Sequence, residues 1–166
     1  MNYHDIKHEN MTNGEGLRCV LFVSGCSHFC KNCQNNQTWD FLSGIPFDNE
    51  ARDEIWDALS KDYIDGITLS GGDPFALENI GVTSKLIHDI KSDFPNKTVW
   101  VYTGYTYDYL LNNFYYSLVN VDVLVDGKYV EELKSPNVKW VGSSNQRVID
   151  VQKSLKNTEV VLWQDA

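Results

Sequence analysis

The sequence predicts an α/β protein whose mostly parallel strands form a partial, open (β/α) barrel. Short apolar runs rich in β-branched residues alternate with segments whose apolar residues repeat at helical spacing, which is typical of a parallel sheet with helical crossovers. The chain has 166 residues. A complete (β/α)8 barrel needs about 200 or more residues, so we expect a barrel that stays open on one side. A chain of this length also predicts one domain, residues 1–166.

Two strands and one helix are predicted before residue 70. Residues 19–23 form an apolar, β-branched run that predicts a buried strand. Asp48 and Asn49 are N-cap candidates for a helix that Gly66 can end. The apolar residues of this helix fit a 3.6-residue period: Ile55, Trp56, Leu59 and Tyr63. Residues 67–69 then form the second predicted strand.

The alternation continues through the second half of the chain. A second helical stripe stops at Pro95 and consists of Leu86, Ile87, Ile90 and Phe94. Residues 98–102 and 121–125 are predicted strands, joined by a short helix through Leu110, Leu111 and Phe114. Residues 139–141 and 160–163 are candidate strands, with a polar loop at 142–147 between them.

Four polar or glycine-rich segments directly follow the predicted strands: the cysteine loop 26–33, then 70–73, 103–104 and 126–128. The carboxyl ends of parallel strands share one edge of a sheet, and ligands bind at that edge. The sequence therefore predicts that these segments converge on one site.

Composition excludes several classes of function. Fourteen Lys and Arg against 23 Asp and Glu give a formal net charge of −9, which argues against a nucleic-acid binder with a basic face. No apolar run approaches the roughly 18 residues of a membrane span. Residues 1–10 have no apolar stretch typical of a signal peptide. We expect a cytoplasmic protein that binds neither nucleic acid nor membrane.

The cysteines carry the most specific signal. All four lie between residues 19 and 33, and three of them, Cys26, Cys30 and Cys33, have the spacing C-x3-C-x2-C. A structural zinc site usually needs four ligands, a redox dithiol uses two cysteines, and buried free thiols would not gather in a polar loop. These alternatives are less favoured than an iron–sulfur cluster. Three thiolates on a four-iron cluster leave one iron open to a substrate.

The cysteine triplet after the first strand, with a Gly-Gly-acid segment after the second, resembles the radical S-adenosylmethionine (SAM) superfamily. The resemblance narrows to the activating proteins of anaerobic ribonucleoside-triphosphate reductase. The segments that carry it are residues 13–16, 21–26, 38–39, 70–74, 100–105, 123–128 and 142–147. Two positions depart from the pattern: Asn32 replaces an aromatic residue that contacts adenine, and Glu15 stands where Pro is expected.

The resemblance implies a [4Fe–4S] cluster held by Cys26, Cys30 and Cys33, with SAM chelated at the open iron. It implies reductive cleavage of SAM and abstraction of a glycine hydrogen from the reductase large subunit, with a low-potential electron donor such as flavodoxin. No side chain beyond the cluster and SAM is needed as an acid or base. The residues expected near SAM are Asn32, Cys33, Gln34, Gly71, Gly72 and Asp73.

Other functions remain as alternatives. The chain could activate a different glycyl-radical enzyme, act on a small molecule by radical SAM chemistry, or serve as a zinc-binding interaction module. Within the preferred interpretation, Gly72 lets the backbone meet SAM. Its replacement by Val is expected to weaken SAM binding and leave the iron content near normal, because the cysteine loop follows a different strand. Roles for Cys19, Lys128 and Arg147 stay open; a turn residue is the plainer interpretation for the last two.

Overall fold

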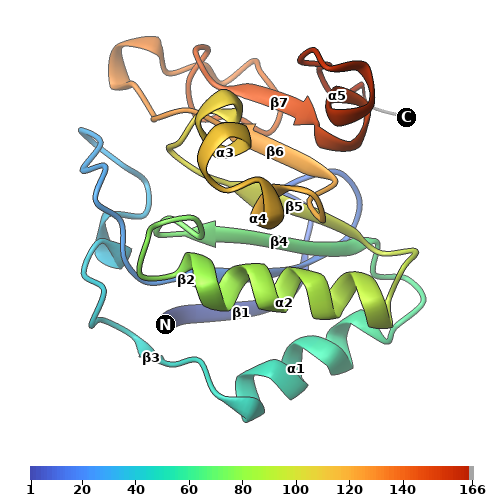
Figure 1. Ribbon diagram of the computed structural model, residues 1–166. Coiled ribbons are helices and arrows are strands. Elements are labelled where there is room, and N and C mark those ends of the chain that lie inside the picture. Colours follow the sequence, from blue (N-terminus) through green and yellow to red (C-terminus); the bar gives the residue numbers. More distant parts are fainter. Residues whose placement is uncertain (165–166) are drawn as a thin grey trace.

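The computed structural model describes residues 1–164 (Figure 1). Its strands are β1 (Asn2–Asn10), β2 (Arg18–Val23), β3 (Ile45–Pro46), β4 (Gly66–Gly71), β5 (Thr98–Tyr102), β6 (Val123–Asp126) and β7 (Arg147–Asp150). Its α-helices are α1 (Asn49–Leu59), α2 (Ile80–Asp93), α3 (Tyr107–Asn113), α4 (Tyr115–Leu118) and α5 (Val151–Asn157). Two short 3₁₀ helices, η1 (Asn36–Thr38) and η2 (Glu131–Leu133), lie in loops.

The strands of the described chain form an open sheet in the order β3-β1-β2-β4-β5-β6-β7. The four central strands, β2, β4, β5 and β6, pair in parallel. β1, β3 and β7 pair antiparallel and extend the sheet toward its two edges. The predicted open α/β sheet with a parallel centre is therefore confirmed, whereas the antiparallel strands were not predicted.

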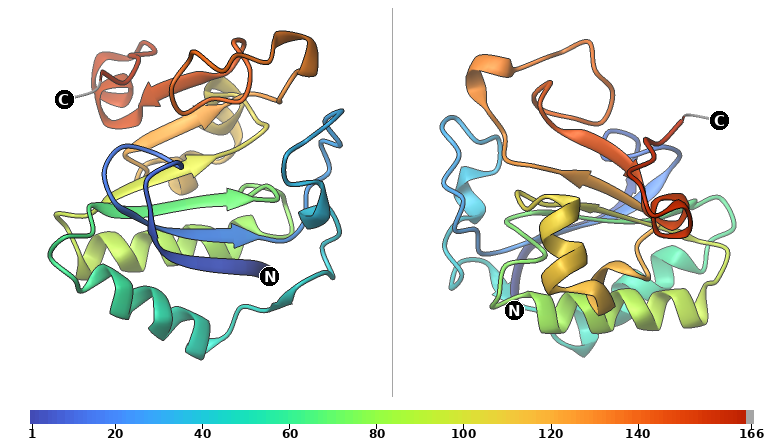
Figure 2. Two further views of the ribbon diagram at one scale, coloured as in Figure 1. Left: turned by 180° about the vertical axis from the view of Figure 1, so that it is seen from behind. Right: turned by 45° about the horizontal axis from the view of Figure 1, so that its top comes forward.

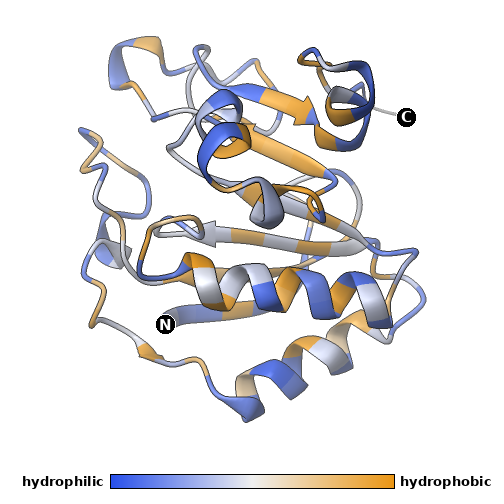
Figure 3. Ribbon diagram, viewed as in Figure 1, coloured by the Kyte–Doolittle hydropathy of each residue, from blue (hydrophilic) through white to orange (hydrophobic). Residues whose placement is uncertain are grey.

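Helices α1 to α4 cover one face of the sheet, as the front and rear views show (Figures 1 and 2). Figure 3 shows hydrophilic and hydrophobic residues alternating along α1 and α2, and an almost continuously hydrophobic β6. The buried residues of α1 are Ala51, Ile55, Ala58 and Leu59, and those of α2 are Thr83, Leu86, Ile87 and Ile90. Their spacing places one stripe of each helix against the sheet. On the other face, Trp100, Val123 and Val125 pack with Trp140 and Trp163.

The predicted helices are present, but α1 and α3 end earlier than expected, and Phe114 directly follows α3. Asp48 caps α1 by accepting a hydrogen bond from the Ala51 amide at 3.0 Å, as the sequence predicts. The inclusion of Tyr63 was wrong, because α1 ends at Leu59 and the Tyr63 side chain is exposed. Phe94 follows the last residue of α2, in agreement with the stop expected at Pro95.

The C-terminal strand predictions were wrong. Residues 139 and 140 form a turn, residue 141 has no regular secondary structure, and Trp140 has a φ of +67° that is incompatible with a strand. Residues 160–163 contribute an isolated bridge between Leu162 and Ile149 rather than a strand. Arg147, predicted to end a loop, instead begins β7. β1 was missed because it is mostly exposed and polar, with Tyr3 and Ile6 as its buried residues.

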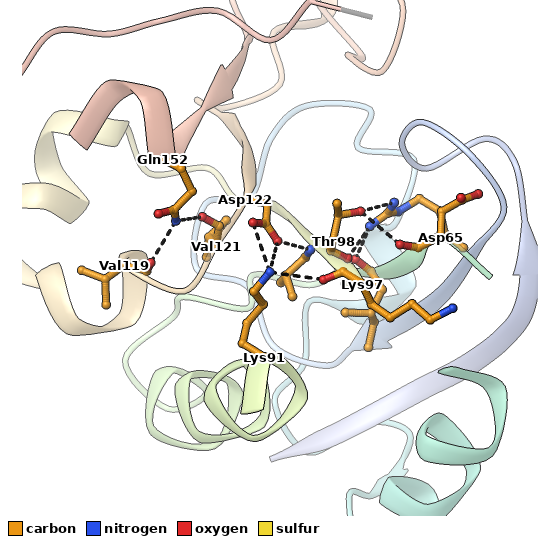
Figure 4. Close-up of polar contacts among 11 residues, drawn as sticks. Asp65, Lys91, Lys97, Thr98, Val119, Val121, Asp122 and Gln152 are labelled. Atoms are coloured by element: carbon orange, nitrogen blue, oxygen red, sulfur yellow. Dashed lines mark hydrogen bonds and ion pairs between the residues drawn. The ribbon is translucent and has the colours of Figure 1, made fainter. Parts of the chain in front are cut away.

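Hydrogen bonds and an ion pair connect the segments near the amino ends of the parallel strands (Figure 4). Lys91 pairs with Asp122 at 3.0 Å, and Asp122 also accepts a hydrogen bond from the Val99 amide at 2.7 Å. Gln152 donates to the carbonyls of Val119 and Val121 at 2.9 and 2.6 Å. These hydrogen bonds connect the chain segments at this end of the sheet, and the loop that carries the three clustered cysteines lies at the opposite end. No helix within residues 1–164 has the length and apolar character to cross a bilayer.

Candidate functional site

A cavity of about 130 Å³ lies at the carboxyl ends of the four parallel strands. Its lining comes from the segments around the ends of β2, β4, β5 and β6 and from the residue before β7: Cys26, His28, Cys30, Cys33, Asn35, Ser70, Gly71, Gly72, Asp73, Tyr102, Thr103, Gly104, Gly127, Lys128, Tyr129 and Gln146. In Figure 1 the cysteine loop and the loop after β6 both lie at the left, where β4 ends. The predicted convergence of these segments is confirmed.

The cysteine loop is held at both ends by backbone hydrogen bonds. The amides of Gly25 and Cys26 donate to the carbonyls of Thr38 and Trp39 at 2.7 and 3.0 Å. Inside the loop, Phe29 and Asn32 adopt left-handed backbone conformations, with φ of +49° and +56°. Left-handed residues other than glycine are uncommon and need support from surrounding contacts. The loop is therefore wound tightly enough to place its cysteines around one cavity.

Each of the three sulfurs accepts a hydrogen bond from a backbone amide. The Asn35 amide donates to the Cys33 sulfur at 3.4 Å. Burial raises the pKa of the Cys26 thiol to about 11, and a hydrogen bond from the His28 backbone opposes this rise. Burial likewise raises the pKa of Cys30, opposed by a hydrogen bond from the Tyr129 backbone. Amide donors to sulfur stabilise thiolates and tune the potential of iron–sulfur clusters, so the donor set fits such a cluster.

The thiols do not converge on one point. Within residues 1–164, no three Cys, His, Asp or Glu side chains lie close enough together to hold a single metal ion. A cubane cluster does not require such convergence, because each thiolate binds a different iron atom. The three half-buried thiols around one open cavity are compatible with this arrangement.

Asp73 is the centre of the hydrogen-bond network beside the cysteines. Its carboxylate is 1% exposed and accepts hydrogen bonds from Thr103 Oγ1 at 2.9 and 3.0 Å and from the Gly104 amide at 3.0 Å. The Phe75 amide donates at 2.8 Å, and His28 Nε2 lies 2.6 Å from the second oxygen. The carboxylate is thus satisfied by the protein itself, and it links the turns after β4 and β5 to the cysteine loop.

The glycine pair allows a close approach between the turn after β4 and the chain that leads into the cysteine loop. Gly71 has a φ of +94°, and a Cβ on Gly72 would lie 2.5 Å from the Gly25 carbonyl oxygen. The Gly72 amide donates to the Val23 carbonyl, and the Asp73 amide donates to the Gly25 carbonyl, both at 2.7 Å. The turn after β4 therefore contacts Gly25, the residue directly before Cys26, although the two segments follow different strands.

The other predicted residues differ in their placement. Gly71, Gly72, Asp73 and Cys33 line the cavity, whereas Asn32 and Gln34 are exposed and do not belong to its lining. Lys128 also lines the cavity, and its charge partly offsets the rise that burial causes in the pKa of Cys30.

Arg147 and Cys19 lie outside the cavity lining and contact residues that stabilise the fold. Arg147 does not line this cavity, and its Nε donates to the buried carboxylate of Asp126 at 3.0 Å. Cys19 is fully buried in the core beneath the helices, and burial raises the pKa of its thiol to about 12.

Two lining residues were not identified from the sequence. Asn35 follows the last cysteine by two residues, and Tyr129 directly follows the 126–128 segment that was singled out. Both act on the thiols through backbone amides, as described above. Because any residue type supplies an amide, side-chain chemistry could not reveal them; their nearness to flagged segments was the available signal.

Comparison with known proteins agrees with this site. Residues 12–149 match the family model described as a 4Fe-4S single cluster domain. The chain is 46% identical over 151 residues to the anaerobic ribonucleoside-triphosphate reductase-activating protein of Escherichia coli K12, covering 89% of this chain and 97% of that protein. The Vibrio cholerae protein of the same name is 42% identical over 148 residues (88% and 96% covered), and that of enterobacteria phage T4 is 41% identical over 148 residues (89% and 93% covered). The chain therefore belongs to the family of anaerobic ribonucleoside-triphosphate reductase-activating proteins.

Proposed function

We propose that this chain is a radical SAM activase that generates a glycyl radical on the large subunit of an anaerobic ribonucleoside-triphosphate reductase. The observation that carries the proposal is the cavity in which three thiols meet the turns after β4, β5 and β6. The names of the relatives support the choice of reductase. We further propose that the open sheet is the partial barrel of the radical SAM type.

Cys26, Cys30 and Cys33 would hold a [4Fe–4S] cluster, with their sulfurs supported by the amides of His28, Tyr129 and Asn35. When bound, such a cluster supplies one electron that cleaves SAM to methionine and a 5′-deoxyadenosyl radical, which takes a hydrogen atom from glycine. The electron would come from a low-potential donor such as flavodoxin.

The chain's own groups would orient SAM. We propose that Gly71 and Gly72 present backbone groups to it, because they line the cavity without side chains. The Asp73 carboxylate is satisfied internally, so its contribution would be to hold these turns in place. Asn32 and Gln34, on either side of Cys33, would contact SAM from the exposed rim of the loop.

The size of the cavity supports a protein substrate. At about 130 Å³ it is smaller than the roughly 300–1,000 Å³ pockets that enclose small molecules. A bound SAM would therefore extend toward solvent, and a loop of the reductase would be needed to cover it. No side chain is assigned as a general acid or base.

Anaerobic reconstitution with iron and sulfide tests the proposal. We expect a brown protein with four irons per chain, because three thiolates hold a cubane and leave one iron open. This protein should consume SAM when dithionite is added. A colourless protein that binds zinc stoichiometrically and leaves SAM intact would instead support an interaction module. SAM consumption with no radical on the reductase would support a different radical SAM substrate.

A further inference from the structure

His28 joins the cysteine loop to the turns after β4 and β5. It lies midway between Cys26 and Cys30, and its side chain is 8% exposed. Its Nε2 atom is 2.6 Å from Asp73 Oδ2. Asp73 in turn accepts hydrogen bonds from Thr103 and Gly104, so a single imidazole connects three strand-end segments.

The direction of the His28 hydrogen bond follows from the other partners of Asp73. Thr103, Gly104 and Phe75 all donate to this carboxylate. A carboxylate that accepts hydrogen bonds from all its other partners acts as an acceptor only, so the remaining partner is the donor. We therefore assign the proton of this contact to Nε2 of His28.

Packing fixes the imidazole as well. The ring makes an edge contact with the Tyr105 ring, at a centroid distance of 4.7 Å. A Cβ on Gly104 would overlap the His28 ring, so the glycine of the β5 turn provides the space that the ring occupies. The position of His28 thus depends on the β5 turn through a hydrogen-bond network and through direct contact.

We propose that His28 is a positioning residue: through Asp73 it holds the cysteine loop against the turns after β4 and β5, and so fixes the thiols relative to the groups that orient SAM. The anchoring of the loop stands on these contacts alone, whereas its consequence for SAM rests on the proposed function. Three substitutions of His28 distinguish the loss of its hydrogen bond to Asp73 from a change in the polarity or size of the side chain. Gln places an amide N–H where Nε2 lies, Asn places it nearer Nδ1, and Leu removes it.

The first measurement uses the full-length protein without iron. Alkylation of Cys26 and Cys30 by iodoacetamide, followed by peptide mass spectrometry at fixed pH, reports how often the loop opens. A lost hydrogen bond to a carboxylate should raise the labelling rate about tenfold in H28N and H28L. H28Q should stay near the parent rate. H88L, at a histidine with a 70% exposed side chain on α2, is the matched control and should not change labelling.

The second measurement uses the reconstituted protein. The three variants should bind iron as the parent does, because the backbone hydrogen bonds of Gly25 and Cys26 remain. H28N and H28L should weaken SAM binding about tenfold, measured by the change that SAM causes in the electron paramagnetic resonance spectrum of the reduced protein. H28Q should restore it. If His28 only stabilised the fold, its replacement would lower the melting temperature, and H28Q and H28N would bind SAM equally well.

Equal labelling of the parent, H28N and H28L would overturn the proposal. Equal labelling of H28Q and H28N would also overturn the proposal. This comparison remains available if H28L does not fold. If labelling changes as expected but even the parent takes up no iron, the anchor stands and the proposed function fails. If the parent binds iron and SAM normally and the variants do too, the anchor has no role in SAM binding.

Discussion

Gly72 lies so close to Gly25 that a Cβ on Gly72 would come within 2.5 Å of the Gly25 carbonyl oxygen. Gly25 immediately precedes Cys26, and its own φ of +95° suits glycine. The first cysteine is thus positioned by two glycines that follow the neighbouring strands β2 and β4, and the β4 turn and the cysteine loop act as one unit.

Gly72→Ala is therefore expected to disturb the cysteine loop. The backbone of Gly25 or Gly72 must shift to accept the methyl group, at a cost of about 1–3 kcal/mol in the free energy of unfolding. Iron uptake should fall together with SAM binding. Urea unfolding and iron analysis of the reconstituted protein measure the two effects.

Gly81→Ala is the matched control. Gly81 lies in α2, and a Cβ there meets no atom within 4 Å. Replacing a helical glycine by alanine should stabilise the protein by about 0.5–1 kcal/mol and leave iron uptake unchanged. Normal iron uptake by Gly72→Ala with reduced SAM binding would contradict the coupling and restore the view that Gly72 faces only SAM.

Replacement of any one of Cys26, Cys30 and Cys33 by alanine should abolish stable cluster assembly. These thiols line the cavity, and a cubane left with two protein ligands is poorly held. Cys19→Ala should retain the cluster, because Cys19 is buried in the core, and should lose only about 1 kcal/mol of stability. Iron and sulfide analysis after anaerobic reconstitution distinguishes the four variants. Loss of iron from Cys19→Ala would refute the assignment of ligands.

Arg147→Leu should destabilise the protein without weakening SAM binding. Arg147 neutralises the Asp126 carboxylate, which is 1% exposed and also caps the Tyr107 amide at 2.8 Å. Its removal leaves this charge buried, although the arginine side chain is 37% exposed, so we expect a loss of about 1–3 kcal/mol.

Lys85→Leu provides the comparison for a surface pair. Lys85 contacts Asp89 at 2.7 Å but has a side chain that is 75% exposed, and its replacement should change stability by less than about 0.5 kcal/mol. Thermal unfolding measures both variants. A well-folded Arg147→Leu protein with weakened SAM binding would assign Arg147 to the binding site instead.

The parallel centre of the sheet was predictable because its strands are buried on both faces. Residues 98–102 were predicted at their observed bounds, since Val99, Trp100 and Val101 form an apolar run. β1 and β7 lie toward the edges, where long-range pairing rather than local composition decides the conformation. In the same way, Trp140 and Trp163 pack on Trp100 from segments outside the strands, which apolar sequence alone cannot distinguish from strands.

The sequence predicted the reactive groups of the candidate site but not the long-range contacts that hold its segments together. The spacing of Cys26, Cys30 and Cys33 indicated an iron–sulfur site, and the edge rule indicated which turns would surround it. The contact between His28 and Asp73 joins residues 45 positions apart and has no signature in either local motif. The contact of Gly72 with Gly25 likewise depends on the parallel pairing of β2 with β4.

SAM cleavage is expected to depend on the reductase. On the proposed function, a cavity of about 130 Å³ would not enclose SAM together with a hydrogen donor, so the partner protein would exclude water from the reaction. Without the large subunit, cleavage should be slow and leave no persistent protein radical. Chromatographic assay of 5′-deoxyadenosine with and without the subunit measures this. Equal rates, with a product formed on a small molecule, would contradict the need for a protein partner.

Transfer of deuterium is the most direct test of the central claim. The reductase large subunit is labelled with deuterium at the glycine α-carbon and mixed anaerobically with the reduced, cluster-loaded protein and SAM. The account predicts deuterium in the 5′-deoxyadenosine and a glycyl doublet on the large subunit in the electron paramagnetic resonance spectrum. Cleavage of SAM that yields unlabelled 5′-deoxyadenosine and no doublet would contradict it.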